Sequence, residues 1–196
     1  PFPDLKAVVK DIPFYSKHGV KGYFGQGSYE SSGGDMAELK AWVIAKLLWN
    51  PERDPDELIS DFLRGYFGPA APPITKYYVA LQRHADKSTI HAHLYSDPNT
   101  YLTKELIELG VKCFDEAEAL SADDPALLKR VRRARLSVTY AQLVCRFPAG
   151  ATDRLALLDQ FERDLKEHNV TKIREWEPLD KSVARIRESL EKLTPK

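Results

Sequence analysis

The spacing of apolar residues predicts helices along most of the chain. Over Asp35–Trp49, apolar residues recur at helical intervals on two neighbouring sides, so this helix is apolar over most of its circumference and should be central. Asn50-Pro51 ends the helix. Asp54 as the N-cap and Pro55 at the first helical position begin the next helix, which ends at Gly68-Pro69. These signals predict a helix hairpin.

Further amphipathic segments follow this hairpin. They predict helices over residues 74–86, 102–120, 124–145, 155–165 and 178–193. The last segment has a regular apolar seam, which we expect to pack against neighbouring helices of a bundle. This seam is formed by Leu179, Val183, Ile186, Leu190 and Leu193.

The start of the chain has a different pattern. Asp4 caps a predicted helix, and the short apolar run Val20–Phe24 predicts a strand that ends in the glycine-rich loop Gly25–Gly34. A single strand lacks partners for its backbone groups, so we expect a segment before Pro1 to pair with it. The lone methionine is Met36, which predicts that the chain is a processed product or a fragment.

Together these patterns predict a mainly α fold, in which a helical bundle-like domain (35–196) follows a short α/β unit (1–34). If that unit ends a larger α/β domain, its loop lies at the C-terminal edge of a sheet, where such folds build their sites. Glu30 is a candidate for one of the two carboxylic acids of a glycosidase, although nothing identifies a partner and an exposed loop acid is the alternative. The candidate polar groups there are Tyr23, Gln26, Ser28, Tyr29 and Glu30.

Trp42 and Trp49 lie one heptad apart on a charged edge of the central helix. One interpretation is a stacking surface for a sugar ring or a partner. The other is that both rings pack under the next helix with their indole N–H groups satisfied, which is commoner for large aromatic residues.

Composition narrows the classes of function. Lysine plus arginine equals aspartate plus glutamate at 29 each, so no net charge attracts nucleic acid or an anionic membrane. No run approaches the ~18 apolar residues that a membrane span needs. Cys113 and Cys145 are expected on helical core faces, as buried free thiols unless their helices are neighbours and the two pair.

Other potential binding motifs are incomplete. His84, His91 and His93 suggest a metal site, but no carboxylate or cysteine spacing completes one, so we expect neither a metal nor a cofactor. The basic run Lys129–Arg135 is balanced by acids elsewhere and is expected to be a solvated helix face. Gly25-Gln26-Gly27 lacks the third glycine of a dinucleotide-binding motif.

The stretch Gly19–Pro72 resembles the bacterial domain of unknown function 4838, which occurs toward the C-terminal end of large carbohydrate-active proteins. The resemblance rests on Gln26-Gly27, Leu39–Trp42 and Leu48–Pro51. The helix that ends in Trp-Asn-Pro is also similar to the segment after the barrel in α-glucuronidases and β-N-acetylglucosaminidases.

This resemblance implies that residues 4–27 are the last helix and strand of a glycosidase-like (β/α) barrel, with a helical domain packed on it. The catalytic acids would lie on earlier strands outside this chain, so no catalytic residue is expected here. Tyr23, Gln26, Tyr29, Glu30 and Trp42 are the expected substrate-binding residues.

The expected function is therefore the non-catalytic C-terminal part of a glycoside-hydrolase-like protein that degrades a polysaccharide, with a periplasmic or extracellular location. Its partners would be a carbohydrate ligand and the preceding barrel. The alternatives are a non-catalytic helical module that binds glycan or acts as a scaffold, and a helical protein-interaction domain.

Overall fold

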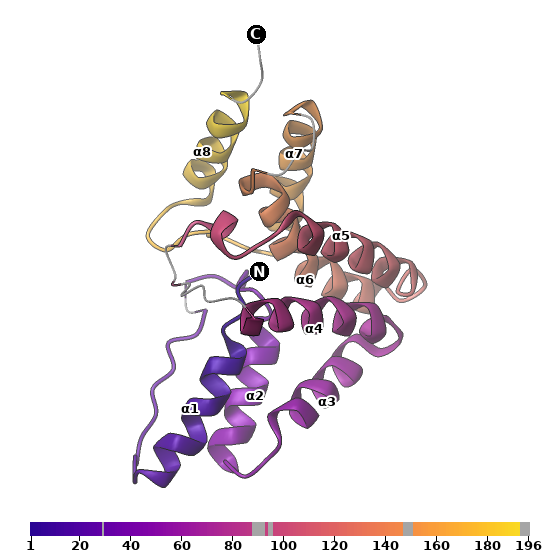
Figure 1. Cartoon of the computed structure of the whole chain (residues 1–196). Helices are drawn as coiled ribbons and strands as arrows, with labels where there is room; N and C mark the ends of the chain where they lie inside the picture. The colour runs from indigo at the N-terminus through magenta and orange to yellow at the C-terminus, as the bar shows by residue number, and fades with distance from the viewer. Residues whose placement is uncertain (29, 88–92, 94–95, 147–150, 193–196) are drawn as a thin grey trace.

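The computed structural model describes residues 1–28, 30–87, 93, 96–146 and 151–192, and all regular structure in these ranges is helical (Figure 1). The predicted mainly α fold is confirmed. The helices are α1 (Leu5–Lys17), α2 (Ala37–Trp49), α3 (Pro55–Phe67), η1 (Gly68–Ala70), α4 (Ala71–Lys87), η2 (Pro98–Thr100), α5 (Lys104–Ala119), α6 (Pro125–Val144), α7 (Ala151–Glu167) and α8 (Leu179–Glu191).

Local capping signals explain where several helices begin. The Asp54 carboxylate accepts a hydrogen bond from the Asp56 N–H at 2.8 Å, with Pro55 at the first helical position of α3. Asp124 does the same for α6, where it accepts from two backbone N–H groups at 3.0 Å. These contacts satisfy N–H groups that have no partner inside the helix.

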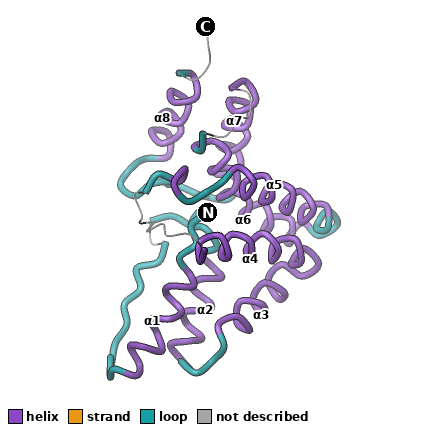
Figure 2. Tube along the Cα trace, in the orientation of Figure 1, coloured by secondary structure: helices purple, strands orange, loops and turns teal. Residues whose placement is uncertain are grey.

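A long connection runs back beside α1 and joins it to α2, and the two helices run in the same direction (Figure 1). Their starts are held together because the Asp35 carboxylate accepts the Phe2 N–H at 2.9 Å and Lys40 Nζ lies 2.6 Å from Asp4. In Figure 2 the returning connection appears as an extended loop beside α1.

The predicted strand Val20–Phe24 is wrong for this structure. The segment is extended, but it is exposed and pairs with no other described segment. A strand is defined by hydrogen bonds to a second strand, and the described part of the chain supplies none. The α/β unit predicted for residues 1–34 is therefore a helix followed by an extended loop.

Two hydrophobic cores hold the helices together. The larger core joins α1 to α6 and includes Leu5 and Val43, so α1 packs in the same core as α2. The predicted domain boundary between residues 34 and 35 stays a prediction. The smaller core joins α6 to α7 and α8, and it buries Ile186 and Leu190 of the predicted seam. Leu193 lies outside the described residues.

Cys113 and Cys145 are buried free thiols, as expected. Burial raises the pKa of Cys145 to about 11 and also raises the pKa of Cys113, so both stay protonated near neutral pH. No described helix is long and apolar enough to cross a membrane.

The basic run on α6 forms ion pairs with acids of neighbouring helices. Arg133 lies 2.8 Å from Glu38, and Arg135 lies 2.7 Å from Asp115 and 2.8 Å from Glu118. The run was expected to be a solvated helix face, but Arg130, Arg133 and Arg135 are half-buried, and Arg133 and Arg135 pair with neighbouring helices.

Gly110 and Gly65 should respond oppositely to substitution by alanine. A Cβ at Gly110 would lie 2.9 Å from Tyr77 Cε2 and 3.1 Å from Val138 Cγ1, whereas a Cβ at Gly65 would have open space. We expect Gly110→Ala to lower the free energy of unfolding by about 1–2 kcal/mol through overpacking. Gly65→Ala should raise it by about 0.5–1 kcal/mol, because alanine favours a helix. Urea denaturation of both variants tests this, and a stabilised Gly110→Ala would contradict the close packing of α4, α5 and α6.

Candidate functional site

The residues predicted to face a substrate have different surroundings. Tyr23 and Gln26 are exposed on the extended connection, whereas the side chain of Glu30 is only 13% exposed. Tyr29 lies outside the described residues. The structure therefore leaves Tyr23 and Gln26 open to solvent and gives Glu30 defined partners.

Glu30 is held by the loop that joins α7 to α8. One carboxylate oxygen lies 2.6 Å from Lys172 Nζ, and the other accepts the Trp176 N–H at 2.9 Å. The hydrogen bond from Lys172, followed by that from Trp176, lowers the pKa of Glu30 below its ordinary value. A general acid needs a raised pKa, so these contacts suit Glu30 to holding the two loops together rather than to donating a proton near neutral pH.

The neighbouring residues extend this contact. Ser31 Oγ accepts hydrogen bonds from the N–H groups of Thr171 at 3.1 Å and Lys172 at 3.3 Å. Gly33 lies so close to Val170 that an added Cβ would approach Val170 Cγ1 to 2.6 Å. We call the contact between residues 30–34 and residues 169–176 the interloop clasp. The interloop clasp fixes the end of the α1–α2 connection against the loop between α7 and α8.

Trp176 is a candidate binding residue that the sequence analysis missed. Its side chain is 77% exposed, and its backbone has a positive φ of 64°, which is uncommon for a bulky residue. The hydrogen bond that the Trp176 backbone N–H donates to the Glu30 carboxylate helps to hold this conformation. Nothing in the local sequence signals the arrangement, because Glu30 and Trp176 are 146 positions apart.

The two tryptophans of α2 differ in their environment. Trp42 packs against Phe62 of α3, with ring centroids 6.2 Å apart, and Lys46 Nζ lies 4.3 Å from the centroid of its ring. Its indole N–H is buried without a hydrogen-bond partner among the described residues. Trp49, at the last position of α2, is 91% exposed. Trp42 thus packs against the next helix as the second interpretation expects, but its indole N–H is not satisfied, and Trp49 does not pack.

The histidines give no metal centre within the described residues. His84 is partly buried on α4 and His93 is exposed, while His91 lies outside the described residues. No group of three histidine, cysteine, aspartate or glutamate side chains in the described ranges could hold a metal ion.

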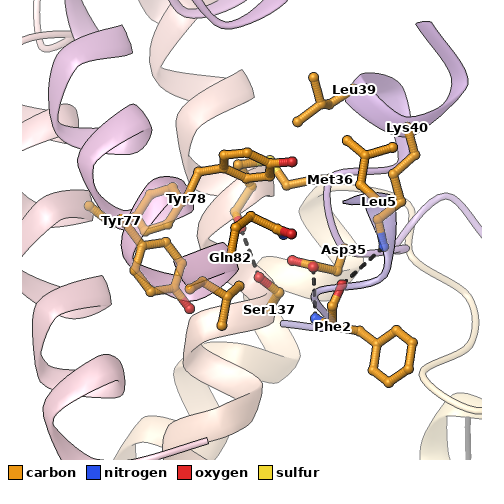
Figure 3. A pocket seen from close by; sticks show the side chains of 13 residues that line it. Phe2, Leu5, Asp35, Met36, Leu39, Lys40, Tyr77, Tyr78, Gln82 and Ser137 are labelled. Carbon is orange, nitrogen blue, oxygen red and sulfur yellow. Dashed lines mark hydrogen bonds between the residues drawn. The ribbon is translucent and has the colours of Figure 1, made fainter. Parts of the chain in front are cut away.

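A small cavity with both apolar and polar lining residues lies where the N-terminal segment meets α2, α4 and α6 (Figure 3). Its volume is about 10 Å³, which is room for about one water molecule and far too little for a sugar ring. The polar side chains that line it are Asp35, Lys40, Tyr77, Tyr78, Gln82 and Ser137.

The charges around this cavity are nearly balanced. Burial raises the pKa of Asp35, but the positive charges of the N-terminus and Lys40, with the hydrogen bonds from Phe2 and Ser137, outweigh it and lower the pKa overall. Asp35 is therefore ionised. Burial raises the pKa of Tyr78, so its hydroxyl keeps its proton and can donate a hydrogen bond. The cavity is suited to hydrogen bonding rather than to catalysis on a sugar.

Comparison with known proteins identifies one matching family. Residues 1–80 match the model of a family described as a domain of unknown function (DUF4838), which supports the resemblance found in residues 19–72. The matched region includes α1, α2, α3 and the first part of α4. No match was found among curated proteins or among solved structures.

Glu30→Gln should loosen the interloop clasp because it removes the charge that pairs with Lys172. We expect a lower hydrogen-exchange protection factor at the Trp176 amide near neutral pH, measured by NMR. The contribution of Glu30 to stability is present above the unfolded-state pKa of about 4.3, and it is lost as the pH falls through the lower folded-state pKa. The wild type should therefore approach the variant only at acid pH.

The matched control is Glu175→Gln, which changes an exposed acid of the same loop that has no ion pair among the described residues. It should leave the protection factor of Trp176 unchanged. Equal protection in the wild type and Glu30→Gln at neutral pH would show that the carboxylate does not hold the loop.

Proposed function

We propose that this chain is the C-terminal helical part of a glycoside-hydrolase-like protein that degrades a polysaccharide or another glycan, and that it is not catalytic by itself. The observation that carries the proposal is that α1 and α2 are parallel and are joined by an extended connection that runs back beside α1 (Figure 1). In β/α folds, successive parallel helices are joined through a strand that runs in the opposite direction and belongs to a sheet.

The extended connection has free hydrogen-bonding capacity for such a sheet. Residues 21–28 make no backbone hydrogen bond to another described residue. Phe24 is 90% exposed and Val20 is half exposed, so apolar side chains accompany the unpaired backbone. Such an edge pairs readily with another strand. A preceding barrel in the parent protein would supply that strand and cover these side chains.

The helices after the connection would then act as a scaffold. The interloop clasp holds the end of the connection against α6 and the α7–α8 loop, because Arg133 of α6 also donates a hydrogen bond to the Ser32 carbonyl at 2.6 Å. These contacts would fix the direction in which Tyr23 and Gln26 face a carbohydrate bound to the barrel. Under this proposal the protein acts on glycans in the periplasm or outside the cell.

The second candidate is a non-catalytic glycan-binding module, which the exposed rings of Trp49 and Trp176 favour. Exposed tryptophan is characteristic of binding surfaces because its ring is large, rigid and amphipathic. The third candidate, a helical interaction domain, was based on the seam of α8. The described positions of that seam pack against α6 and α7, so we do not propose it as a partner-binding surface.

Hydrogen exchange of Val20–Phe24 tests the barrel proposal. In this chain alone the amides of residues 21–24 should exchange without protection, because they are exposed and unpaired, whereas the Val20 N–H donates a hydrogen bond to the Tyr15 carbonyl at 3.0 Å. In the full-length protein, strand pairing should slow their exchange by roughly 100-fold or more.

The coding DNA upstream of Pro1 should also encode roughly 200 or more residues of alternating strand and helix. A start codon immediately upstream of Pro1, or equal exchange in both forms, would refute the proposal.

Affinity electrophoresis in gels that contain neutral or anionic polysaccharide tests the binding module. If Trp176 stacks on a sugar, Trp176→Ala should abolish retardation by the polysaccharide that retards the wild type, with an unchanged melting temperature. Trp49→Ala, which removes the exposed ring at the C-terminal end of α2, tests in the same way whether this second ring contributes to binding. Wild-type migration that no polysaccharide changes would contradict glycan binding by this chain.

A further inference from the structure

Two buried polar groups on α4 point to a binding site inside the protein. Tyr78 is 7% exposed and Gln82 is 4% exposed, and both line the cavity of Figure 3. The Tyr78 hydroxyl and the Gln82 side-chain carbonyl have no hydrogen-bond partner among the described residues. Buried polar atoms are almost always hydrogen-bonded in folded proteins, so this pair calls for a ligand.

The spacing of the two residues places them on one face of the helix. Tyr78 and Gln82 are four positions apart on α4, which stacks their side chains one turn above the other. The hydroxyl, kept protonated by burial, can donate a hydrogen bond, while the amide carbonyl can only accept one. A bridging ligand must therefore both accept and donate.

The cavity selects a small neutral ligand. Its volume of about 10 Å³ corresponds to one water molecule, and it is too small for a phosphate or a sugar. The ammonium group of Lys40 lines the same cavity and disfavours a cation, whereas the carboxylate of Asp35 disfavours an anion. Water meets the donor and acceptor requirements, and the nearby Ser137 hydroxyl offers it a third polar partner.

We propose that this cavity binds one water molecule, which accepts a hydrogen bond from the Tyr78 hydroxyl and donates one to the Gln82 side-chain carbonyl. The site adjoins the contacts that join the starts of α1 and α2, since Asp35 accepts the Phe2 N–H and Lys40 Nζ lies 3.3 Å from the Phe2 carbonyl oxygen. The water would thus be held by α4 in a cavity that this junction also lines.

Tyr78→Phe tests the proposal by the sign of its effect. If a water is bound, the variant loses a buried hydrogen bond, and its melting temperature should fall by about 2–4 °C. If the cavity is dry, the variant removes an unsatisfied hydroxyl, and the melting temperature should stay the same or rise. That second result would overturn the proposal. Tyr15→Phe, at a solvent-exposed tyrosine of α1, is the matched control and should change nothing.

Gln82→Met tests whether one water serves both groups, since methionine keeps the side-chain length and removes the acceptor. The double variant should lose less stability than the sum of the two single losses, because both substitutions remove partners of the same molecule. If the two losses of stability were strictly additive, the proposal that one water bridges both groups would be overturned.

A high-resolution crystal structure should show the water within about 3.2 Å of both the Tyr78 hydroxyl oxygen and the Gln82 side-chain carbonyl oxygen. A direct hydrogen bond between Tyr78 and Gln82 in its place would refute the site. Neither residue belongs to the extended connection, so these outcomes leave the proposed function untouched.

Discussion

The arrangement of this protein depends on α6, which buries different sides in two hydrophobic cores. Val131 and Val138 contribute to the core shared with α1 to α5, whereas Leu136 and Leu143 contribute to the core shared with α7 and α8. With 20 residues, α6 is about 30 Å long, enough to support both groups of helices. Any change that tilts this helix would therefore disturb both cores together.

Arg133 extends the influence of α6 to the proposed functional region. Its guanidinium pairs with Glu38 of α2 and donates a hydrogen bond to the Ser32 carbonyl, next to the interloop clasp. The clasp in turn joins Glu30 to Lys172 and Trp176. The loop after the extended connection is thus fixed by packing and charge from the helical part. Such support is what a scaffold must provide if this loop faces a substrate bound elsewhere.

The extended connection gives the clearest link between structure and proposed function. It joins two parallel helices and carries exposed apolar side chains, and the backbone of residues 21–28 makes no hydrogen bond to another described backbone group. Burial of apolar surface and pairing of backbone groups both favour covering it. The match to the family model spans this connection and the helices on either side. We propose a different role for the cavity beside Tyr78 and Gln82, since its size suits it to a structural water and not to a substrate.

The sequence by itself determined the features that depend on neighbouring residues. The Asp54-Pro55 and Asp124-Pro125 signals placed the starts of α3 and α6, because a cap acts within one helical turn. Helical periodicity likewise identified the seam of α8. Local apolar character at Val20–Phe24 was not enough for a strand, since pairing needs a second strand that the described chain does not supply.

Only the tertiary structure decided which side chains meet. Trp42 and Trp49 have equivalent positions in the heptad, yet α3 covers Trp42, while Trp49 lies at the helix end beyond its reach. Glu30, Lys172 and Trp176 come together over more than 140 positions, and their spacing gives no local signal. Packing between distant elements, which no short-range pattern encodes, therefore set the surroundings of Glu30 and Trp42.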